Sequence, residues 1–165
     1  MPNPRLLANA KRYVQTRDAH ITNCIGGGTD GTVWKTDQPS AIKVLELEKN
    51  YRMELGRYQR LADHGVRNVL GLVVPRILGW DDDLMVVEME LVSPPCLIDF
   101  AKAYLDWQPE HSKEQWEDHL LSQRDLWGEH FGDVQAILWK LEQIGIYYRD
   151  PKPANIMFED WDLLE

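Results

Sequence analysis

Two consecutive prolines, Pro94 and Pro95, mark the sharpest change of pattern in this sequence. Before them, apolar residues fall into several short runs of the kind that form β-strands, with joins that contain glycine or proline. After them, apolar residues recur mainly every three or four positions, which is typical of helices. The sequence therefore predicts an α+β protein with two lobes, residues 1–92 and 93–165, and a hinge at the prolines.

The first lobe is expected to begin with an amphipathic helix and to continue as an antiparallel sheet. Residues 4–16 place Leu6, Ala10 and Tyr13 on one helical face. Three short strands in tandem imply a meander, and a second helix over 50–62 precedes two further strands. The predicted strands are 21–25, 32–35, 41–44, 73–78 and 84–91.

The second lobe is expected to be mostly helical. A short helix is predicted over 97–105, and the polar connector 107–122 has room for a helical turn or two. A long helix is predicted over 123–144, with Gly145 as its end. The loop 147–156 follows directly.

The charge of the chain argues against some partners. Its formal net charge is -9 at pH 7, whereas nucleic acid and anionic membranes are bound through an excess of Lys and Arg. No apolar run approaches the roughly 20 residues that cross a bilayer. Two cysteines, Cys24 and Cys96, are too few and too far apart for a disulfide framework or a zinc site. We expect a soluble, cytoplasmic protein without nucleic-acid or membrane partners, in which an anionic ligand needs a local basic or backbone-amide site.

A glycine cluster joins the first two predicted strands. Residues 26–33 fit the pattern G-x-G-x-x-G-x-V, with glycines at Gly26, Gly28 and Gly31 and the valine at Val33. A turn without side chains lets backbone amides approach phosphate oxygens closely. The element that follows is a strand and not a helix, which disfavours a dinucleotide-binding loop. A flexible hairpin loop without a ligand is the alternative.

A lysine lies among apolar residues in the third predicted strand. The side chain of Lys43 faces away from those of Ile42 and Val44, and its position after the glycine loop suits contact with a phosphate. Glu54, on the helix that follows, is the favoured partner to orient this lysine. The alternatives are that Lys43 is an ordinary surface lysine and that Glu54 is a solvated carboxylate without a partner.

The loop 147–156 carries three polar side chains at fixed offsets, Asp150, Lys152 and Asn155, and two prolines, Pro151 and Pro153, stiffen it. An aspartate can accept the proton of an attacking hydroxyl, a lysine can neutralise phosphate charge, and an amide oxygen can bind magnesium. A turn that Pro and Asp favour for local reasons alone is the alternative.

Taken in order, the glycine cluster, Lys43, Glu54 and residues 149–155 resemble four motifs of protein kinases and related small-molecule kinases: the glycine loop, the phosphate-anchoring lysine, its helix glutamate and the catalytic loop. The resemblance implies a two-lobed kinase-like fold, with an antiparallel sheet and one helix in the first lobe and a truncated helical second lobe. It also implies that ATP and Mg2+ are the cofactors. The γ-phosphate would pass to a hydroxyl of a protein Ser or Thr or of a small molecule.

The resemblance assigns a role to each matching residue. Lys43, oriented by Glu54, would hold the α and β phosphates. Asp150 would be the base, Lys152 would neutralise the transferred phosphate, and Asn155 would bind magnesium. The residues implied to contact the nucleotide are Gly26, Gly28, Gly31, Val33, Ala41 and Lys43, the hinge-strand residues Glu88, Met89 and Glu90, and Val87 at the back of the adenine pocket.

The chain departs from the family pattern after the loop. The usual Asp-Phe-Gly is missing, and Asp160 and Asp162 follow Asn155 by only five and seven residues. They are the candidate second metal ligands, and an acidic surface tail is the alternative. Tyr148 stands where the family often has histidine.

The elements that form a peptide platform in protein kinases are also missing, so the acceptor stays open. We therefore weigh a phosphotransferase against an inactive pseudokinase that serves as a binding or scaffolding module, and against a fragment of a longer kinase. An exposed apolar remainder of the shortened second lobe would mark a protein partner.

Overall fold

The computed structural model describes residues 3–100 and 102–159, which form an α+β chain of two compact units. The first unit comprises the residues up to 67 together with 75–93, and the second comprises 68–74 and the residues from 94 onward. The division therefore falls between Ser93 and Pro94, and the short segment 68–74 belongs to the second unit. No helix of the described chain is long and apolar enough to cross a membrane.

A five-stranded antiparallel sheet forms the centre of the first unit, with strand order β1-β2-β3-β7-β6. The tandem meander predicted for the first three strands is present. The strand predicted over 73–78 is wrong, because Pro75 interrupts it and residues 72–73 pair in the second unit. The strands are β1 (Ile21–Gly27), β2 (Gly31–Thr36), β3 (Ser40–Leu45), β6 (Ile77–Asp81) and β7 (Val86–Glu90).

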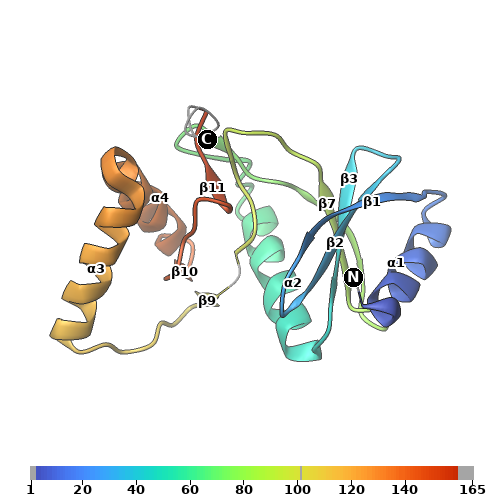
Figure 1. Ribbon diagram of the computed structural model, residues 1–165, viewed down its shortest axis with the longest axis horizontal. Coiled ribbons are helices and arrows are strands. Elements are labelled where there is room, and N and C mark those ends of the chain that lie inside the picture. Colours follow the sequence, from blue (N-terminus) through green and yellow to red (C-terminus); the bar gives the residue numbers. More distant parts are fainter. Residues whose placement is uncertain (1–2, 101, 160–165) are drawn as a thin grey trace. The chain divides into compact units, whose positions relative to one another are not determined.

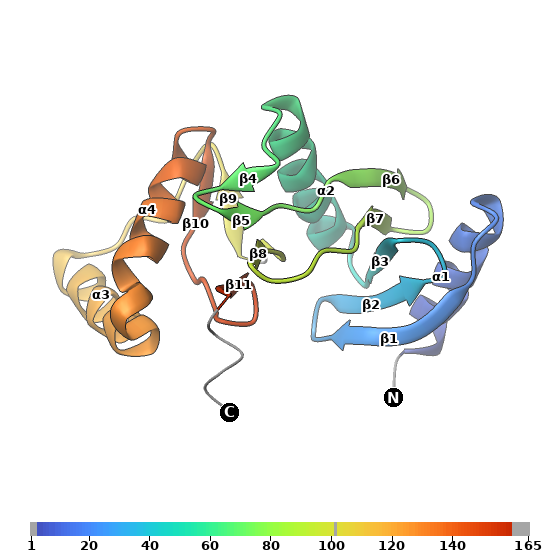
Figure 2. The ribbon, with the colours of Figure 1, turned by 90° about the horizontal axis from the view of Figure 1, so that it is seen from above.

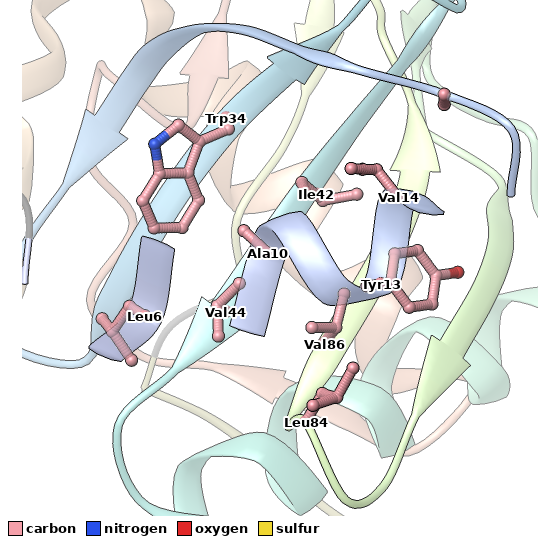
Figure 3. Close-up of a cluster of buried hydrophobic side chains, with 10 residues drawn as sticks. Leu6, Ala10, Tyr13, Val14, Trp34, Ile42, Val44, Leu84 and Val86 are labelled. Carbon is pink, nitrogen blue, oxygen red and sulfur yellow. The ribbon is translucent and has the colours of Figure 1, made fainter. Parts of the chain in front are cut away.

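Helix α1 (Pro4–Thr16) covers one face of this sheet, as Figure 3 shows. Its start is fixed by Asn3, whose side chain accepts a hydrogen bond from the backbone N–H of Arg5 at 3.0 Å. The predicted apolar face of the helix is buried against the sheet. This cluster contains Leu6, Ala10, Tyr13 and Val14 of the helix and Trp34, Ile42, Val44, Leu84 and Val86 of the sheet and its loops.

Helix α2 (Glu48–Asp63) packs against strands β3, β6 and β7. Figure 1 shows α1 and α2 on either side of the sheet. Successive side chains of a strand point to opposite faces, so β3 presents Ile42 and Val44 to α1 and Ala41 and Lys43 to α2. All six residues of β3 are buried.

The second unit combines two helices with short strands (Figure 2). One sheet has the order β11-β8-β5-β4, and β9 pairs with β10. The helices are α3 (Lys113–Trp127) and α4 (Phe131–Glu142). The strands are β4 (Asn68–Val69), β5 (Leu72–Val73), β8 (Cys96–Leu97), β9 (Ala103–Leu105), β10 (Ile146–Tyr148) and β11 (Ile156–Met157).

The helix predicted over 97–105 is wrong. Its ends are strands β8 and β9, and the backbone is left-handed at Asp99 (φ 53°) and Lys102 (φ 62°), a conformation that a right-handed helix excludes. Leu97 and Ala103 of this segment are instead buried in strands that pair with β11 and β10, which lie far along the chain.

The long helix predicted over 123–144 is two helices. Helix α3 starts earlier, at Lys113, because Ser112 and Gln115 form a capping box. It ends at Trp127, because the next residue, Gly128, has a φ of 53°, and a short 3-10 turn over Gly128–His130 then leads into α4. The apolar spacing predicted for this region is nevertheless present, since Trp127, Val134 and Leu141 are buried.

Two buried tyrosine hydroxyls make the first unit sensitive to high pH. The Tyr13 hydroxyl donates to Glu88 Oε2 at 2.9 Å, and the Tyr51 hydroxyl donates to Asp82 Oδ1 at 2.8 Å. Burial, reinforced by these carboxylates, raises the pKa of both phenols above the ordinary value. Their contribution to stability is complete below about pH 10, where tyrosines of the unfolded chain begin to ionise, and is lost as the pH rises towards the folded-state pKa.

We therefore expect the free energy of unfolding to fall between about pH 10 and pH 11. Urea denaturation followed by circular dichroism at both ends of this interval measures the loss. The double variant Tyr13→Phe, Tyr51→Phe should be less stable near neutral pH but should lose less over the same interval. Equal losses in the variant and the wild type would contradict this explanation.

Candidate functional site

The register of the first sheet brings four of the singled-out residues into one row. Gly26 pairs with Val33, Val33 with Lys43, and Lys43 with Val87. Cross-strand partners point to the same face of a sheet, and Lys43 identifies this face as the one that carries α2. The next row on the same face pairs Ala41 with Met89.

The glycine loop between β1 and β2 contains one glycine that the fold requires and one that it does not. A Cβ on Gly31 would collide with the carbonyl oxygen of Val44 on the neighbouring strand. A Cβ on Gly28 would meet nothing within 4 Å, and Gly28 does not have a positive φ. Packing within this unit therefore explains Gly31 and leaves Gly28 without a structural reason, while its exposed backbone suits the close approach of a ligand.

The same loop is anchored to the segment that leads into α2. Gly28 N–H donates to the carbonyl of Gly31 at 3.0 Å, which closes the turn. The carbonyl oxygen of Asp30 accepts a hydrogen bond from the N–H of Glu46 at 3.0 Å. The carboxylate of Asp30 accepts one from Asn50 Nδ2 at 2.9 Å. The loop therefore has a defined position relative to Lys43 and α2.

Lys43 and Glu54 form the pair that the sequence predicts. Lys43 Nζ donates to Glu54 Oε1 at 2.8 Å, and the two side chains are 11% and 3% exposed. The second oxygen of the same carboxylate lies 3.3 Å from Nη1 of Arg57, one turn along α2. Glu54 is therefore clamped between two cations, and this arrangement fixes the ammonium of Lys43 on the sheet face. Arg57 is a member of the cluster that sequence reasoning missed, although its i,i+3 spacing from Glu54 was a visible signal.

The three predicted hinge residues do not all lie on the face of the sheet that carries Lys43. Met89 shares the Lys43 face, whereas the carboxylate of Glu88 lies on the α1 face, 2.9 Å from the Tyr13 hydroxyl and 3.2 Å from Arg17 Nε. The carboxylate of Glu90 pairs with Arg67 and Arg76. The backbone N–H of Glu90 donates a hydrogen bond to the carbonyl oxygen of Arg76.

In the second unit, the loop with Asp150, Lys152 and Asn155 connects β10 to β11. Strand β10 pairs with β9 and strand β11 with β8, so each end of the loop is held by a separate strand pair. Inside the loop, the N–H groups of Asn155 and Ile156 both donate to the carbonyl of Lys152, at 2.8 and 3.0 Å. The side chain of Lys152 is exposed.

Tyr148 orients the amide of Asn155. The buried Tyr148 hydroxyl donates to the carbonyl of Asp99 at 3.0 Å, and it accepts a hydrogen bond from Asn155 Nδ2 at 3.0 Å. Because the amide nitrogen is turned towards Tyr148, the amide oxygen faces the other way and is suited to a hard cation such as magnesium. Tyr148 stood out in the sequence only as a departure from the family pattern, and its hydroxyl was the signal for this role.

Asp150 is paired with a residue that the sequence did not single out. Lys102 Nζ lies 3.1 Å from Asp150 Oδ2, and the two side chains are 65% and 38% exposed. Lys102 comes from the left-handed turn between β8 and β9, in the segment wrongly predicted as a helix. No sequence pattern signals this pair, because it depends on that turn.

The remaining metal candidates, Asp160 and Asp162, lie outside the described residues. Within 3–100 and 102–159, no group of three or more His, Cys, Asp or Glu side chains is arranged to hold a metal ion. Asn155 is therefore the predicted metal ligand whose geometry can be described. A magnesium ion keeps several waters and shares phosphate oxygens of its substrate, so one protein oxygen is chemically compatible with such a site.

Removing the charge of Glu54 should destabilise the first unit strongly. In Glu54→Gln the two buried cations lose their shared carboxylate, which should lower the free energy of unfolding by roughly 3–5 kcal/mol, the range for breaking a buried pair. Glu48→Gln, on the same helix, breaks the exposed pair with Arg52 and should change stability little. Urea denaturation measures both variants, and similar losses in the two would show that Glu54 does not hold this cluster together.

Neither a protein-family model nor a curated protein sequence matches the chain. The solved structures that resemble it include the following two. The streptomycin–ATP–APH(2″)-IIa ternary complex is 11% identical in sequence, with a TM-score of 0.39. The match covers 76% of this chain and 35% of the chain in that complex. The ADP-bound aminoglycoside phosphotransferase APH(2″)-Ib is 13% identical in sequence, with a TM-score of 0.40. The match covers 86% of this chain and 55% of the phosphotransferase chain. The chain thus spans less than two thirds of the length of either structure that it resembles.

Proposed function

We propose that this chain is an ATP-binding, kinase-like phosphotransferase that passes the γ-phosphate of ATP to a hydroxyl acceptor with the help of Mg2+. The observation that carries the proposal is the row Gly26, Val33, Lys43 and Val87 on one sheet face, with Lys43 held by the buried Glu54. The cytosol is the proposed location, and both cysteines of the chain are free thiols.

The first unit supplies the nucleotide-binding groups. The phosphates would lie close to the backbone of the glycine loop, because Gly28 has no side chain and is not packed against any neighbour within 4 Å of where a Cβ would be. Lys43 would neutralise the α and β phosphates, and Glu54 keeps its ammonium in position. Val33, Ala41, Val87 and Met89 give the same face an apolar surface suited to an adenine ring.

The second unit supplies the groups for transfer. Asp150 would accept the proton of the acceptor hydroxyl as its oxygen bonds to the γ-phosphorus, while the bond from that phosphorus to the β–γ bridging oxygen breaks and ADP leaves with the electron pair. Lys152 would offset charge on the transferred group. Asn155, with Asp160 or Asp162, would hold Mg2+, which when bound neutralises charge on the β and γ phosphate oxygens.

An inactive binding module is the second candidate, and the ion pair of Asp150 favours it. The carboxylate of Asp150 already has Lys102 as its partner at 3.1 Å and is therefore not free to accept the hydrogen bond of an acceptor hydroxyl at that oxygen. The enzyme therefore requires Asp150 to exchange this partner before it acts. The two candidates differ in turnover and not in nucleotide binding.

Magnesium-dependent ATP binding tests the nucleotide site. Isothermal calorimetry should detect binding to the wild type, and Lys43→Met should weaken it at least tenfold, because a charge-assisted contact to phosphate is lost. Lys49→Met, which removes an exposed lysine from α2, serves as the control of equal charge and should bind as the wild type does. Absence of binding to the folded wild type at millimolar ATP would refute the proposal.

Turnover tests Asp150. Asp150→Asn should lower magnesium-dependent phosphate release or autophosphorylation by about 100-fold or more, with ATP binding retained. Asp133→Asn, an exposed position on α4, is the control. ATP binding without any turnover in the wild type would favour the binding module, and equal turnover in Asp150→Asn and the wild type would remove Asp150 from the mechanism.

A further inference from the structure

A basic pocket adjoins Asp150 in the second unit. Its volume is about 270 Å³, and Lys102, His111, His119 and Arg149 line it together with Asp150. A second pocket of about 400 Å³ shares His111 and Arg149 with it and adds Glu110. Both pockets are formed largely by residues 108–119, the connector to which neither ATP binding nor catalysis gives a role.

The charge of the first of these pockets is opposite to that of the chain. Two side chains that are cationic at neutral pH and two imidazoles face one carboxylate, Asp150, which Lys102 already neutralises at 3.1 Å. The chain as a whole has a net charge of -9. A local excess of positive charge in an acidic protein concentrates anions at that point.

Arg149 gives the strongest indication of a ligand. Its guanidinium lies over the ring of Trp116, 4.9 Å from the centroid, which holds it in place through a cation–π contact. Its Nε is buried and makes no hydrogen bond within the described chain. A buried donor on a charged group is costly when it has no acceptor, and the carboxylates or phosphates that match a guanidinium fork would supply acceptors.

Two aromatic side chains complete the pocket. Tyr104 is packed edge-on against Trp107 with ring centroids 4.9 Å apart, and Trp116 lies 5.6 Å from the ring of His119. Flat, braced rings provide an apolar wall beside the basic groups. A pocket of this size and composition suits a small molecule with one anionic end.

We propose that this pocket binds the anionic group, a carboxylate or a phosphate, of a small hydroxyl-bearing acceptor. Arg149 and Lys102 grip the anion, and the hydroxyl of the same molecule then lies beside Asp150, which lines the same pocket. An anion that takes Lys102 as its partner also releases the carboxylate of Asp150 for proton transfer. The acceptor role rests on the proposed phosphotransferase function, whereas anion binding does not.

Nuclear magnetic resonance of the indole N–H groups tests anion binding without nucleotide. Trp116→Phe assigns the Trp116 signal among the seven tryptophans of the chain. Glycerol 3-phosphate and malate should each shift this signal saturably, and their relative affinities separate phosphate from carboxylate. Glycerol, which has the hydroxyls without the anion, should not shift it. A shift by glycerol as large as that by glycerol 3-phosphate, or no shift by either anion, overturns the proposal.

Matched lysine variants test the location of the site. Lys102→Gln should weaken anion binding at least tenfold, and Arg149→Gln should do the same if it retains the wild-type circular dichroism spectrum. Lys140→Gln removes an equal charge from α4, away from both pockets, and should bind as the wild type does. If Lys102→Gln and Lys140→Gln weaken anion binding equally, the effect comes from the overall charge of the protein, and the proposal that the anion binds in this pocket is wrong.

The two proposals fail in different ways. If Mg-ATP binds to the first unit but neither anion shifts the Trp116 signal, the basic pocket is wrong and the phosphotransferase stands. If the anions bind and Mg-ATP does not, the phosphotransferase is wrong and the pocket remains an anion-binding site.

Discussion

Strand β3 is buried on both faces, and much of the first unit follows from this constraint. Ile42 and Val44 satisfy one face by packing under α1. On the opposite face the strand carries Lys43, and a buried ammonium needs a partner to offset its loss of hydration. Glu54 fulfils that need at 2.8 Å, and Arg57 in turn neutralises the other oxygen of the carboxylate. The ion pairs among Lys43, Glu54 and Arg57 therefore fix both the position of α2 on the sheet and the direction of the lysine side chain.

The second unit depends on a different device, which is the pairing of very short strands distant in sequence. Strands β8 and β9 lie on either side of one tight turn, and β10 and β11 on either side of the loop with Asp150. Their pairing sets the loop beside the turn, and this proximity produces two contacts: Lys102 with Asp150, and Tyr148 with the carbonyl of Asp99. Strands of two or three residues have little stability alone, so the geometry of this loop depends on packing beneath it by buried rings such as Phe100 and Tyr148.

Local pattern predicted the first unit well because local pattern determines it. The bounds of α1, the tandem strands and the pairing of Lys43 with Glu54 follow from alternation, from helical spacing and from the order of elements along the chain. The failures occur where distant contacts override spacing. Residues 97–105 have helical apolar spacing, yet Asp99 and Lys102 adopt left-handed backbone to allow pairing with β10 and β11. The partners of Asp150 and Asn155 were missed for the same reason, and the roles of the site residues stay predictions.

The contact between Glu88 and α1 ties the start of the chain to the centre of the first sheet. A central-strand carboxylate, 6% exposed as a residue, depends on Tyr13 and Arg17 for its hydrogen bonds, and Gly79 on β6 has no side chain where the Tyr13 hydroxyl lies. The first helix is thus an integral layer of this unit and not an appendage. A shortened chain that began after Arg17 would uncover an apolar sheet face and leave this carboxylate without those donors, so residues 3–17 belong to the minimal folding unit.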